Sequence, residues 1–445
     1  MTVPAAQLDY LRQVAESGDV SAFLREAAKL KAPDLSDLLA ELDPKFRLRI
    51  VQALPPELVS EALAEMEHDE HPEAVLAALN PEQAADILEE LEPDDAADLI
   101  GELPPATASR ILSYVADRAD LERLLAYKED TAGGLMTPEV VRVPVSATAA
   151  EAIDEIRRQA DEMENFYQVY CVDDGGRLVG VLPLQRLVAA PPDRKVEELM
   201  EAPEAVAHPD LDQEEVARLM ARYNVAALPV VDRDGKLLGR VTFDDVIDVV
   251  EAESTEDLLR FGGVPEEEEM GASWKEAVRS RLPWLFVNTL TAFAAAAVVY
   301  WFQDAINAAV VLAVFMPIVA GQGGNAGTQA LAVTVRRLAL GLIPRGQALE
   351  VVRKEVLVGM ANGLAVGAAV GLVAAVAGGN AMLGVVVLLA MWGNLMVAGL
   401  IGSVVPLVMQ RLGADPAVSS SMFVTPVTDA CGFLLLLGLA SWLLL

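Results

Sequence analysis

The sequence predicts a multidomain membrane protein: an all-α superhelical N-terminal domain, a tandem pair of α/β units, a connecting helix and a five-helix α transmembrane domain. Three observations support this. Charge is confined to one part of the chain, short motifs repeat within the charged part, and five apolar stretches follow residue 280. The 445 residues include 66 acidic and 33 basic side chains, for a net charge of −33. Only seven basic and five acidic residues follow residue 280, which excludes a wholly soluble protein.

The first domain, residues 1–130, has an internal period. Apolar residues recur 12 or 13 positions apart, and proline follows most of them within two positions. Because proline is tolerated in the first turn of a helix, the pattern predicts short helices that each begin near a proline. Short repeats of this kind stack into a superhelix. The recurring positions are Leu42, Leu54, Met66, Leu79, Leu91 and Leu103.

Acidic residues recur within this first domain. Asp94 and Asp98 are four positions apart and therefore share one helix face, and Glu61 lies three repeats earlier. A solvated surface is the ordinary interpretation of such a pair. Cation binding is the alternative, because every cytoplasmic segment of this chain accumulates carboxylates.

Residues 131–198 and 199–243 form two similar units. Each begins with a related motif (MTP at 136–138, MEAP at 200–203) and continues with an amphipathic helix, an apolar strand and an Asp-Gly turn. Asp-Gly between two strands is a strong hairpin signal. The units resemble CBS domains, which pair through their sheets and sense ligands or mediate pairing. That resemblance makes ATP a candidate ligand, because the second unit has the Ser/Thr-x-x-Asp ribose motif as Thr242 to Asp245. The first unit lacks the motif.

A connecting segment, residues 244–280, leads from the second unit toward the membrane. Its first part is helical in pattern, with apolar residues on one face and acidic pairs three positions apart on another. An acidic, solvated connector is one interpretation. The second interpretation is that divalent cations bridge such surfaces. It is favoured because two carboxylates 4 Å apart repel each other by about 4 kcal/mol. The run 266–269 (EEEE) is expected to be solvated linker.

Residues 281–445 are the predicted transmembrane domain. A membrane-spanning helix needs about 20 apolar residues, and basic residues mark the loops that stay in the cytoplasm. Bases cluster at 336–354, with Arg411 in a later loop, while the other two loops have none. We therefore expect a multi-pass protein of the cytoplasmic (inner) membrane with residues 1–280 inside and the C-terminus outside. The five stretches are 284–302, 308–335, 356–377, 382–409 and 419–445.

Asp429 is an isolated charge in the fifth stretch. It lies ten positions after the start of that stretch, about 15 Å along a helix, which is mid-bilayer depth. No Lys, Arg or His shares the stretch, and a lone carboxylate there costs at least about 2.5 kcal/mol. A proton, a base on another helix or a cation must therefore compensate it. We predict an ion site on a wet pathway, with Asn325, Thr425 and Thr428 as further pore-lining candidates.

The polar groups near Asp429 are oxygens and amides, which favour hard cations such as Mg2+ or Ca2+. One carboxylate per chain is little for a divalent ion, and a two-fold dimer would supply two. Elsewhere in the spans, the polar, glycine-rich stretch 321–329 predicts irregular backbone. Glycines at 359, 363, 367 and 371 predict a smooth packing ridge, and Asn394 a helix–helix contact.

Taken together, the chain resembles the MgtE family of magnesium channels and transporters over nearly its whole length. The most specific matches are 132–139 (AGGLMTPE), 323–329 (GGNAGTQ) and Asp429, in that order. The resemblance implies a homodimer, a central pore where Asp429 holds hydrated Mg2+, a connecting helix that acts as a plug, and closure by cytoplasmic Mg2+. The sensor carboxylates it implies are Glu61, Asp94, Asp98, Asp212, Glu214, Asp245, Asp248, Glu253, Glu256 and Asp257, with Asn224 where an acidic ligand is expected.

Other classes of function remain as alternatives or are disfavoured. A membrane-anchored nucleotide sensor or scaffold would make Asp429 merely structural, and a proton-coupled divalent cation exchanger would use it as a proton carrier. An enzyme is disfavoured because the chain has no nucleophile–base pair, no phosphate-binding glycine loop and no metal-hydrolase spacing. Nucleic-acid binding is disfavoured by the net negative charge.

Overall fold

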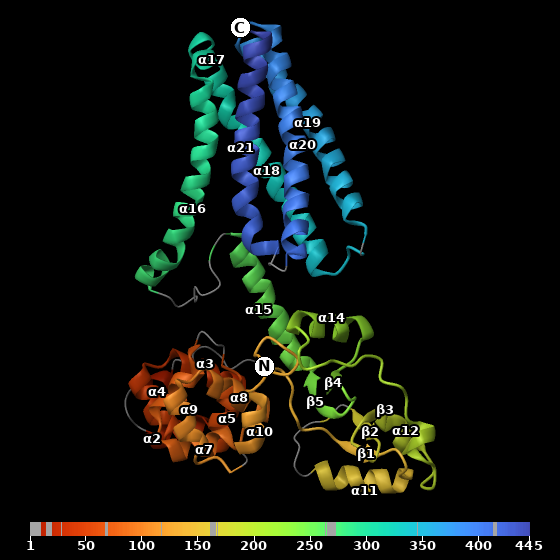
Figure 1. Ribbon diagram of the computed structural model, residues 1–445. Helices are drawn as coiled ribbons and strands as arrows, with labels where there is room; N and C mark the ends of the chain where they lie inside the picture. Colours follow the sequence, from red (N-terminus) through yellow and green to blue (C-terminus); the bar gives the residue numbers. More distant parts are fainter. Residues whose placement is uncertain are drawn as a thin grey trace. The chain divides into compact units, whose positions relative to one another are not determined.

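The computed structural model (Figure 1) describes residues 10–14, 20–27, 29–66, 70–116, 118–160, 166, 168–262, 264, 273–344, 346–412 and 416–445. The chain forms two compact units, Met1–Ala252 and Glu253–Leu445. The acidic run 266–269 lies outside the described residues. The first unit holds the helical domain and the paired α/β units, and the second holds the apolar helices.

The N-terminal part of the first unit is a stack of short helices. Six of them begin on a proline, which confirms the predicted role of proline at the first helical position. Their recurring apolar residues form the core, with Leu91 partly buried. The helices are α2 (Val20–Ala27), α3 (Ala32–Glu41), α4 (Pro44–Val51), α5 (Pro56–Ala64), α6 (Pro72–Ala78), α7 (Pro81–Leu88), α8 (Pro93–Gly101), α9 (Pro105–Leu112) and α10 (Arg118–Leu124).

Both predicted hairpins are present in the α/β units. Strand β2 pairs antiparallel with β3, and β4 pairs antiparallel with β5. In each Asp-Gly turn the glycine has positive φ, 76° at Gly176 and 82° at Gly235, and an aspartate side chain accepts two backbone N–H bonds. The elements are β1 (Arg142–Pro144), α11 (Ala149–Ala160), β2 (Val169–Val172), β3 (Leu178–Leu182), α12 (Leu184–Ala189), α13 (Val196–Leu199), α14 (Gln213–Tyr223), β4 (Ala227–Val231) and β5 (Leu237–Thr242).

The two α/β units exchange their leading segments. Thr137, in the leading segment of the first unit, pairs with Arg240 on β5, and Glu201, in the leading segment of the second, pairs with Val181 on β3. Glycine permits each crossing, because a Cβ at Gly239 would lie 2.4 Å from the Thr137 carbonyl oxygen. The equivalent Gly180 faces the Glu201 carbonyl oxygen at 2.7 Å. The repeated motif therefore joins the two copies.

Helix α15 (Phe243–Phe261) follows β5 directly and crosses the boundary between the two units at Ala252. The next described helix, α16, begins at Trp274, before the predicted start of the transmembrane domain at residue 281. Ser273 and Glu276 form a capping box there, which explains where the helix begins.

The second unit is a bundle of long apolar helices (Figure 1), as the fold prediction requires. Four of its helices in the described part of the chain are long and apolar enough to cross a membrane. Helix α18 has the length but not the composition, because its glycines and amides lower its hydropathy. The helices are α16 (Trp274–Trp301), α17 (Gln303–Ala308), α18 (Leu312–Ala339), α19 (Ala348–Ala377), α20 (Ala381–Arg411) and α21 (Pro416–Leu443).

The prediction of irregular backbone at 321–329 is wrong, because α18 is continuous through it. Two glycines there serve packing instead. A Cβ at Gly323 would meet the Asn394 side chain, and one at Gly327 would lie 2.4 Å from a Val424 methyl. Asn394 donates to the Val319 carbonyl oxygen at 2.9 Å, which confirms its predicted helix–helix contact.

The glycine ridge of α19 packs directly on α20. All four glycines are buried, and a Cβ at Gly359 would lie 2.3 Å from the Leu395 carbonyl oxygen. The predicted packing role is therefore confirmed, and it follows from the small-residue rule for membrane helices.

We expect Gly359→Ala to lower the stability of the full-length protein in detergent by about 1–3 kcal/mol, because the added methyl must push the two helices apart. Gly321→Ala is the matched control, since nothing lies within 4 Å of its Cβ position. A melting temperature of Gly359→Ala at or above that of the control would contradict the packing role. Thermal unfolding followed by circular dichroism measures both.

Candidate functional site

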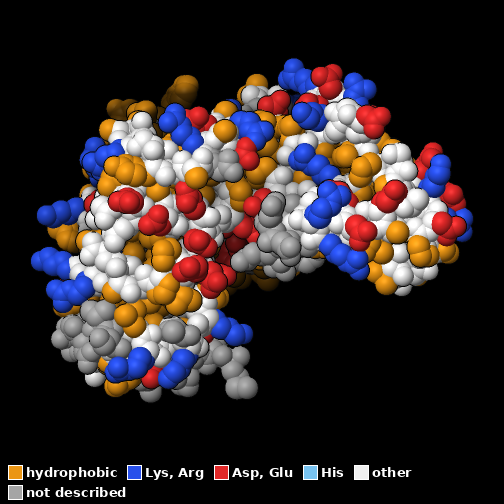
Figure 2. Space-filling model, turned by 90° about the horizontal axis from the view of Figure 1, so that it is seen from below, with side chains coloured by type: hydrophobic (Ala, Val, Ile, Leu, Met, Phe, Trp, Pro, Cys, Tyr) orange, Lys and Arg blue, Asp and Glu red, His pale blue; other side chains and the backbone are white. Residues whose placement is uncertain are grey.

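Carboxylates from two distant parts of the first unit gather into what we call the acidic cluster: Glu92, Asp94, Asp95 and Asp98 around α8, with Asp244 and Asp245 at the start of α15. Glu92 is the N-cap of α8, and Asp94 and Asp95 lie in its first turn. Acidic residues suit that turn because they complement the helix dipole. Figure 2 shows a group of acidic side chains near the middle of the face that it draws, with further acidic and basic side chains distributed around it.

Asp94 is buried, with 6% of its surface exposed, because α8 packs its neighbours Ala96 and Ala97 into the core. Burial is the main cause that raises its pKa well above the ordinary value, and the charges of Asp245 and Asp95 raise it further. The interpretation of Asp94 and Asp98 as a simple solvated pair is therefore wrong.

The neighbouring carboxyls respond in the same way. Burial, followed by the charge of Asp245, raises the pKa of Asp95 to about 7. Burial, followed by the charge of Glu129, raises that of Asp98 to about 8. Desolvation also raises the pKa of Glu92, and Arg240 counteracts part of that rise. At neutral pH Asp95 and Asp98 are therefore poised between the neutral and charged forms.

Asp245 enters the cluster from the α/β side. The Thr242 hydroxyl and backbone N–H both donate to its Oδ2, at 2.5 and 3.1 Å. These bonds lower the pKa of Asp245, but desolvation outweighs them and the net shift is upward. Within the candidate ribose motif, Thr242 is therefore already hydrogen-bonded to Asp245, and the motif lies among negative charges.

The donor set of the acidic cluster is suited to a hard cation. It consists of carboxylate oxygens, the ligands preferred by Mg2+ and Ca2+. Asp94 Oδ1 is buried and has no hydrogen-bond donor, so a cation or a water bound to one would satisfy it. Across the described residues, no three His, Cys, Asp or Glu side chains are close enough to hold a metal ion directly. Binding through the ion's own water fits this arrangement better than direct contact.

Several predicted sensor residues lie apart from this cluster. Glu61 is exposed on α5. Asp212 caps α14 by accepting from the Glu214 backbone N–H at 3.0 Å, and the Glu214 side chain pairs with Arg218. Asn224 ends that helix in the left-handed conformation, φ 53°, which asparagine tolerates better than most residues.

The remaining predicted residues follow along α15. Asp248 is exposed, yet the protein around it removes part of its water, and this partial desolvation, followed by the charges of Glu251 and Asp244, raises its pKa. Glu256 pairs with Arg260 one turn later. Glu253 and Asp257 are partly buried on the same helix.

Glu92 and Asp95 are missing from the residues that the sequence predicts as ligands, although both belong to the cluster. Their signal is the segment 92–95 (EPDD), which places three acids around a helix-initiating proline. That pattern predicts a helix N-terminus, but it does not reveal that the turn is buried against residues 150 positions later.

In the second unit, Asp429 lies on α21 and is half-buried. Thr425, one turn earlier, is exposed on the same face. Thr428 is fully buried and its hydroxyl donates to the Thr425 carbonyl oxygen at 2.9 Å, so it faces the packed interior rather than a pathway. Asn325 is exposed on α18. The structure thus leaves Asp429, Thr425 and Asn325 accessible.

Family models match most of the chain. Residues 316–439 match the model described as a divalent cation transporter, MgtE, and residues 30–130 match the MgtE intracellular N domain. CBS domain models match 132–193 and 196–252. The magnesium transporter MgtE of Thermus thermophilus is 40% identical over 334 residues, covering 74% of this chain and 73% of that protein. The chain belongs to the MgtE family.

Other relatives agree with this assignment. The magnesium transporter MgtE of Enterococcus faecalis is 36% identical, covering 73% of this chain and 72% of that protein. The solved cytosolic domain of the Mg2+ channel MgtE in complex with ATP is 39% identical and aligns with a TM-score of 0.51 over 54% of this chain and 99% of its own. This chain is therefore a membrane protein of a magnesium transporter family and not an enzyme.

The raised pKa values predict how stability depends on pH. A native state whose carboxyls have pKa values of about 7 and 8 binds more protons than the unfolded chain, whose carboxyls titrate near pH 4. We expect the free energy of unfolding of a soluble fragment ending at residue 262 to fall as pH rises from about 4 to about 8. Denaturant titrations without divalent ions at several pH values measure it.

The variant Asp95→Asn/Asp98→Asn removes the two titrating groups and should flatten that slope. Asp86→Asn, at an exposed position on the neighbouring α7, is the control and should leave the slope unchanged. An equal slope in both variants would assign the pH dependence to carboxyls elsewhere.

Proposed function

We propose that this protein is a magnesium-selective channel that mediates Mg2+ uptake and is closed by cytoplasmic Mg2+. The observation that carries the proposal is the accessible carboxylate of Asp429 on a membrane helix. Within the described residues it forms no ion pair or hydrogen bond with the chain. A charge in that position is costly in a bilayer unless a proton or a cation compensates it, and its neighbour Thr425 adds further oxygen.

The pore is proposed to form between two copies of the chain. In the most apolar stretch of α16 only 6% of the residues are buried within one copy of the chain, whereas 50% are buried in the corresponding stretch of α20. Two-fold symmetry would bring two Asp429 carboxylates to one axis and give a divalent ion matched charge. Mg2+ loses water reluctantly, so we propose that the ion passes this point with much of its hydration shell.

The proposed gate depends on the acidic cluster. At low Mg2+ the carboxylates repel, α8 separates from the start of α15, and the connecting helix moves away from the pore. At high Mg2+ the added positive charge favours the compact arrangement. An ion shifts such an equilibrium only by its preference for one state, and several weak sites acting together make the response steep.

The proposed orientation places the first unit in the cytoplasm and the C-terminus outside. Its support is the distribution of basic residues. Arg336, Arg337, Arg353 and Lys354 lie at one end of α18 and α19, and Arg411 ends α20.

Asp429→Ala should reduce Mg2+ flux to the level of empty liposomes, because the pore loses its only proposed charged ligand. The reconstituted variant should keep the elution volume and melting temperature of the parent. Asp304→Asn, at an exposed acid of α17, is the control and should retain flux. Undiminished flux in Asp429→Ala would refute the pore assignment.

Millimolar Mg2+ should protect residues 244–280 of the full-length protein from limited proteolysis, relative to KCl of equal ionic strength. Asp94→Asn/Asp98→Asn/Asp245→Asn should abolish the protection, while Asp86→Asn should retain it. Protection that survives the triple replacement would remove the acidic cluster from the gate. Cleavage sites and rates are read by mass spectrometry.

Nucleotide sensing is the second candidate, supported by the ATP complex of the related cytosolic domain. The closed Thr242–Asp245 pair and the surrounding carboxylates oppose a triphosphate at that position. Proton-coupled exchange is the third, and it requires the flux in liposomes to follow an imposed pH gradient at constant Mg2+.

A further inference from the structure

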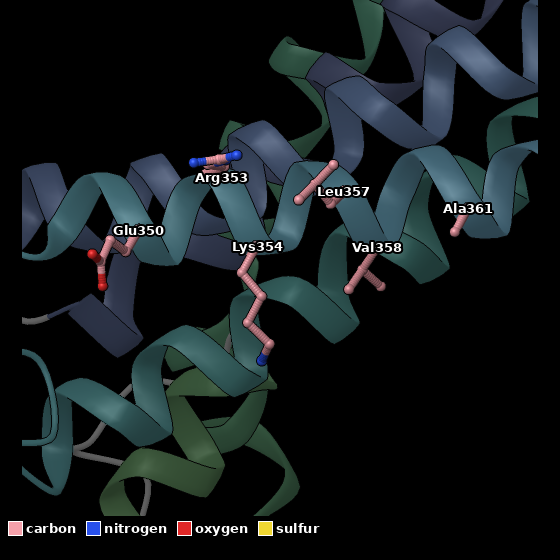
Figure 3. Close-up of a pocket in the computed structure, with 6 residues that line it drawn as sticks. All are labelled: Glu350, Arg353, Lys354, Leu357, Val358 and Ala361. Carbon is pink, nitrogen blue, oxygen red and sulfur yellow. The ribbon is translucent and has the colours of Figure 1, made fainter.

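Two adjoining pockets lie where α18 ends and α19 begins. The first, of about 400 Å3, is lined by Glu350, Arg353, Lys354, Leu357, Val358 and Ala361, all on α19 (Figure 3). The second, of about 170 Å3, shares Glu350 and Lys354 with it and adds residues from the end of α18 and the following turn, including Arg337. The two pockets form one continuous surface, which we call the α18–α19 groove.

One end of the groove is basic. Three basic residues and one acidic residue, Glu350, line the two pockets. In the described part of the chain, Arg337 and Arg353 form no ion pair, and Lys354 lies 3.4 Å from Glu355. Two guanidinium groups are therefore available to an anion, and they can bind a phosphate group through paired N–H donors.

The other end of the groove is apolar. Leu357 and Val358 are 52% and 42% exposed, and Ala361 continues the surface one turn further. Figure 3 shows Lys354 and Val358 on one side of α19, and Arg353 and Leu357 on the other. From Arg353 to Ala361 the helix advances about 12 Å toward the bilayer interior. This length suits the upper part of an acyl chain.

We propose that the α18–α19 groove binds an anionic phospholipid, with the phosphate held between Arg337 and Lys354 and an acyl chain along Val358 and Ala361, on the same side of α19 as Lys354 (Figure 3). The order of groups along the groove, basic and then apolar, is the order of groups in a lipid from headgroup to tail. Basic pockets at the ends of membrane helices are typical sites for anionic headgroups. A zwitterionic headgroup fits less well, because its own positive group would be repelled by the excess of basic side chains.

The bound lipid would join two helices that have little direct contact. Helix α19 packs mainly on α20 and has few contacts with α18. A phosphate shared between Arg337 of α18 and Lys354 of α19, which line the same pocket, would hold this corner together. The groove shares no residue with the Asp429 site or the acidic cluster, so the lipid proposal can be disproved without disproving the proposed channel.

The test measures lipid retention by the full-length protein in detergent, with native mass spectrometry and equal amounts of phosphatidylglycerol and phosphatidylcholine. We expect the parent to retain phosphatidylglycerol preferentially. Each base removed from the groove should lower that retention about fivefold, so Arg337→Gln/Lys354→Gln should lose most of it. Arg411→Gln, an exposed base outside the groove, is the control and should match the parent.

Ala361→Trp fills the apolar end and leaves the basic end intact. It should reduce retention of the diacyl lipid, which identifies a lipid rather than a free anion as the ligand. Equal retention of the two lipids by the parent, or an equal loss in Arg411→Gln, would overturn the proposal. So would full displacement by millimolar inorganic phosphate together with no effect of Ala361→Trp. Should the double variant not elute as a single species, Lys354→Gln alone provides the test, because that side chain is exposed.

Discussion

Repulsion between carboxylates held on a partly buried surface is the constraint on which the first unit depends. Helix α8 is anchored by apolar neighbours such as Leu99 and Ile100, so its acidic first turn cannot escape into water without breaking the core. Two charges about 4 Å apart repel by about 4 kcal/mol at an effective dielectric constant near 20, a large share of the stability of a domain. The carboxyls respond by taking up protons, as the raised pKa values of Asp95 and Asp98 show. The packing of α8 against the start of α15 is therefore only marginally stable. A cation that replaces the protons on these carboxylates can change that stability.

Much of the fold could be predicted from the sequence, because its signals are local. Proline at a helix start restricts the backbone by itself, and the six helices that begin on proline follow directly. Asp-Gly turns specify hairpins through the positive φ of glycine and the aspartate side chain, as Gly176 and Gly235 show. The glycine ridge of α19 could also be predicted from the sequence, because four glycines at helical spacing are favourable only where another helix packs closely against them.

The site was predictable only in part, because its decisive contacts are long-range. The spacing of Asp94 and Asp98 predicts a shared helix face, but their burial depends on residues near 245 that no local pattern connects to them. The glycine-rich stretch of α18 shows the same limitation. Composition alone predicts broken backbone at 321–329, whereas the glycines accommodate the side chains of Asn394 and Val424 and leave the helix intact. In both cases the residue types were identified correctly, and the partner across the fold determined what they do.

Within the second unit, Asn394 and Asp429 show how an apolar bundle treats polar groups in two different ways. Asn394 is fully buried, its amide donates to the Val319 carbonyl oxygen, and glycines at 323 and 432 make room for it. A neutral amide can be accommodated in this way because the hydrogen bond that it donates offsets part of its desolvation, even though its Oδ1 has no hydrogen-bond donor. A carboxylate cannot, since its charge remains after any single hydrogen bond. Asp429 instead lies where the packed interior ends, beside the exposed Thr425. This difference in placement follows from charge alone, and it makes Asp429 the group in this bundle best placed to meet a partner from outside the chain, whether an ion or a second copy.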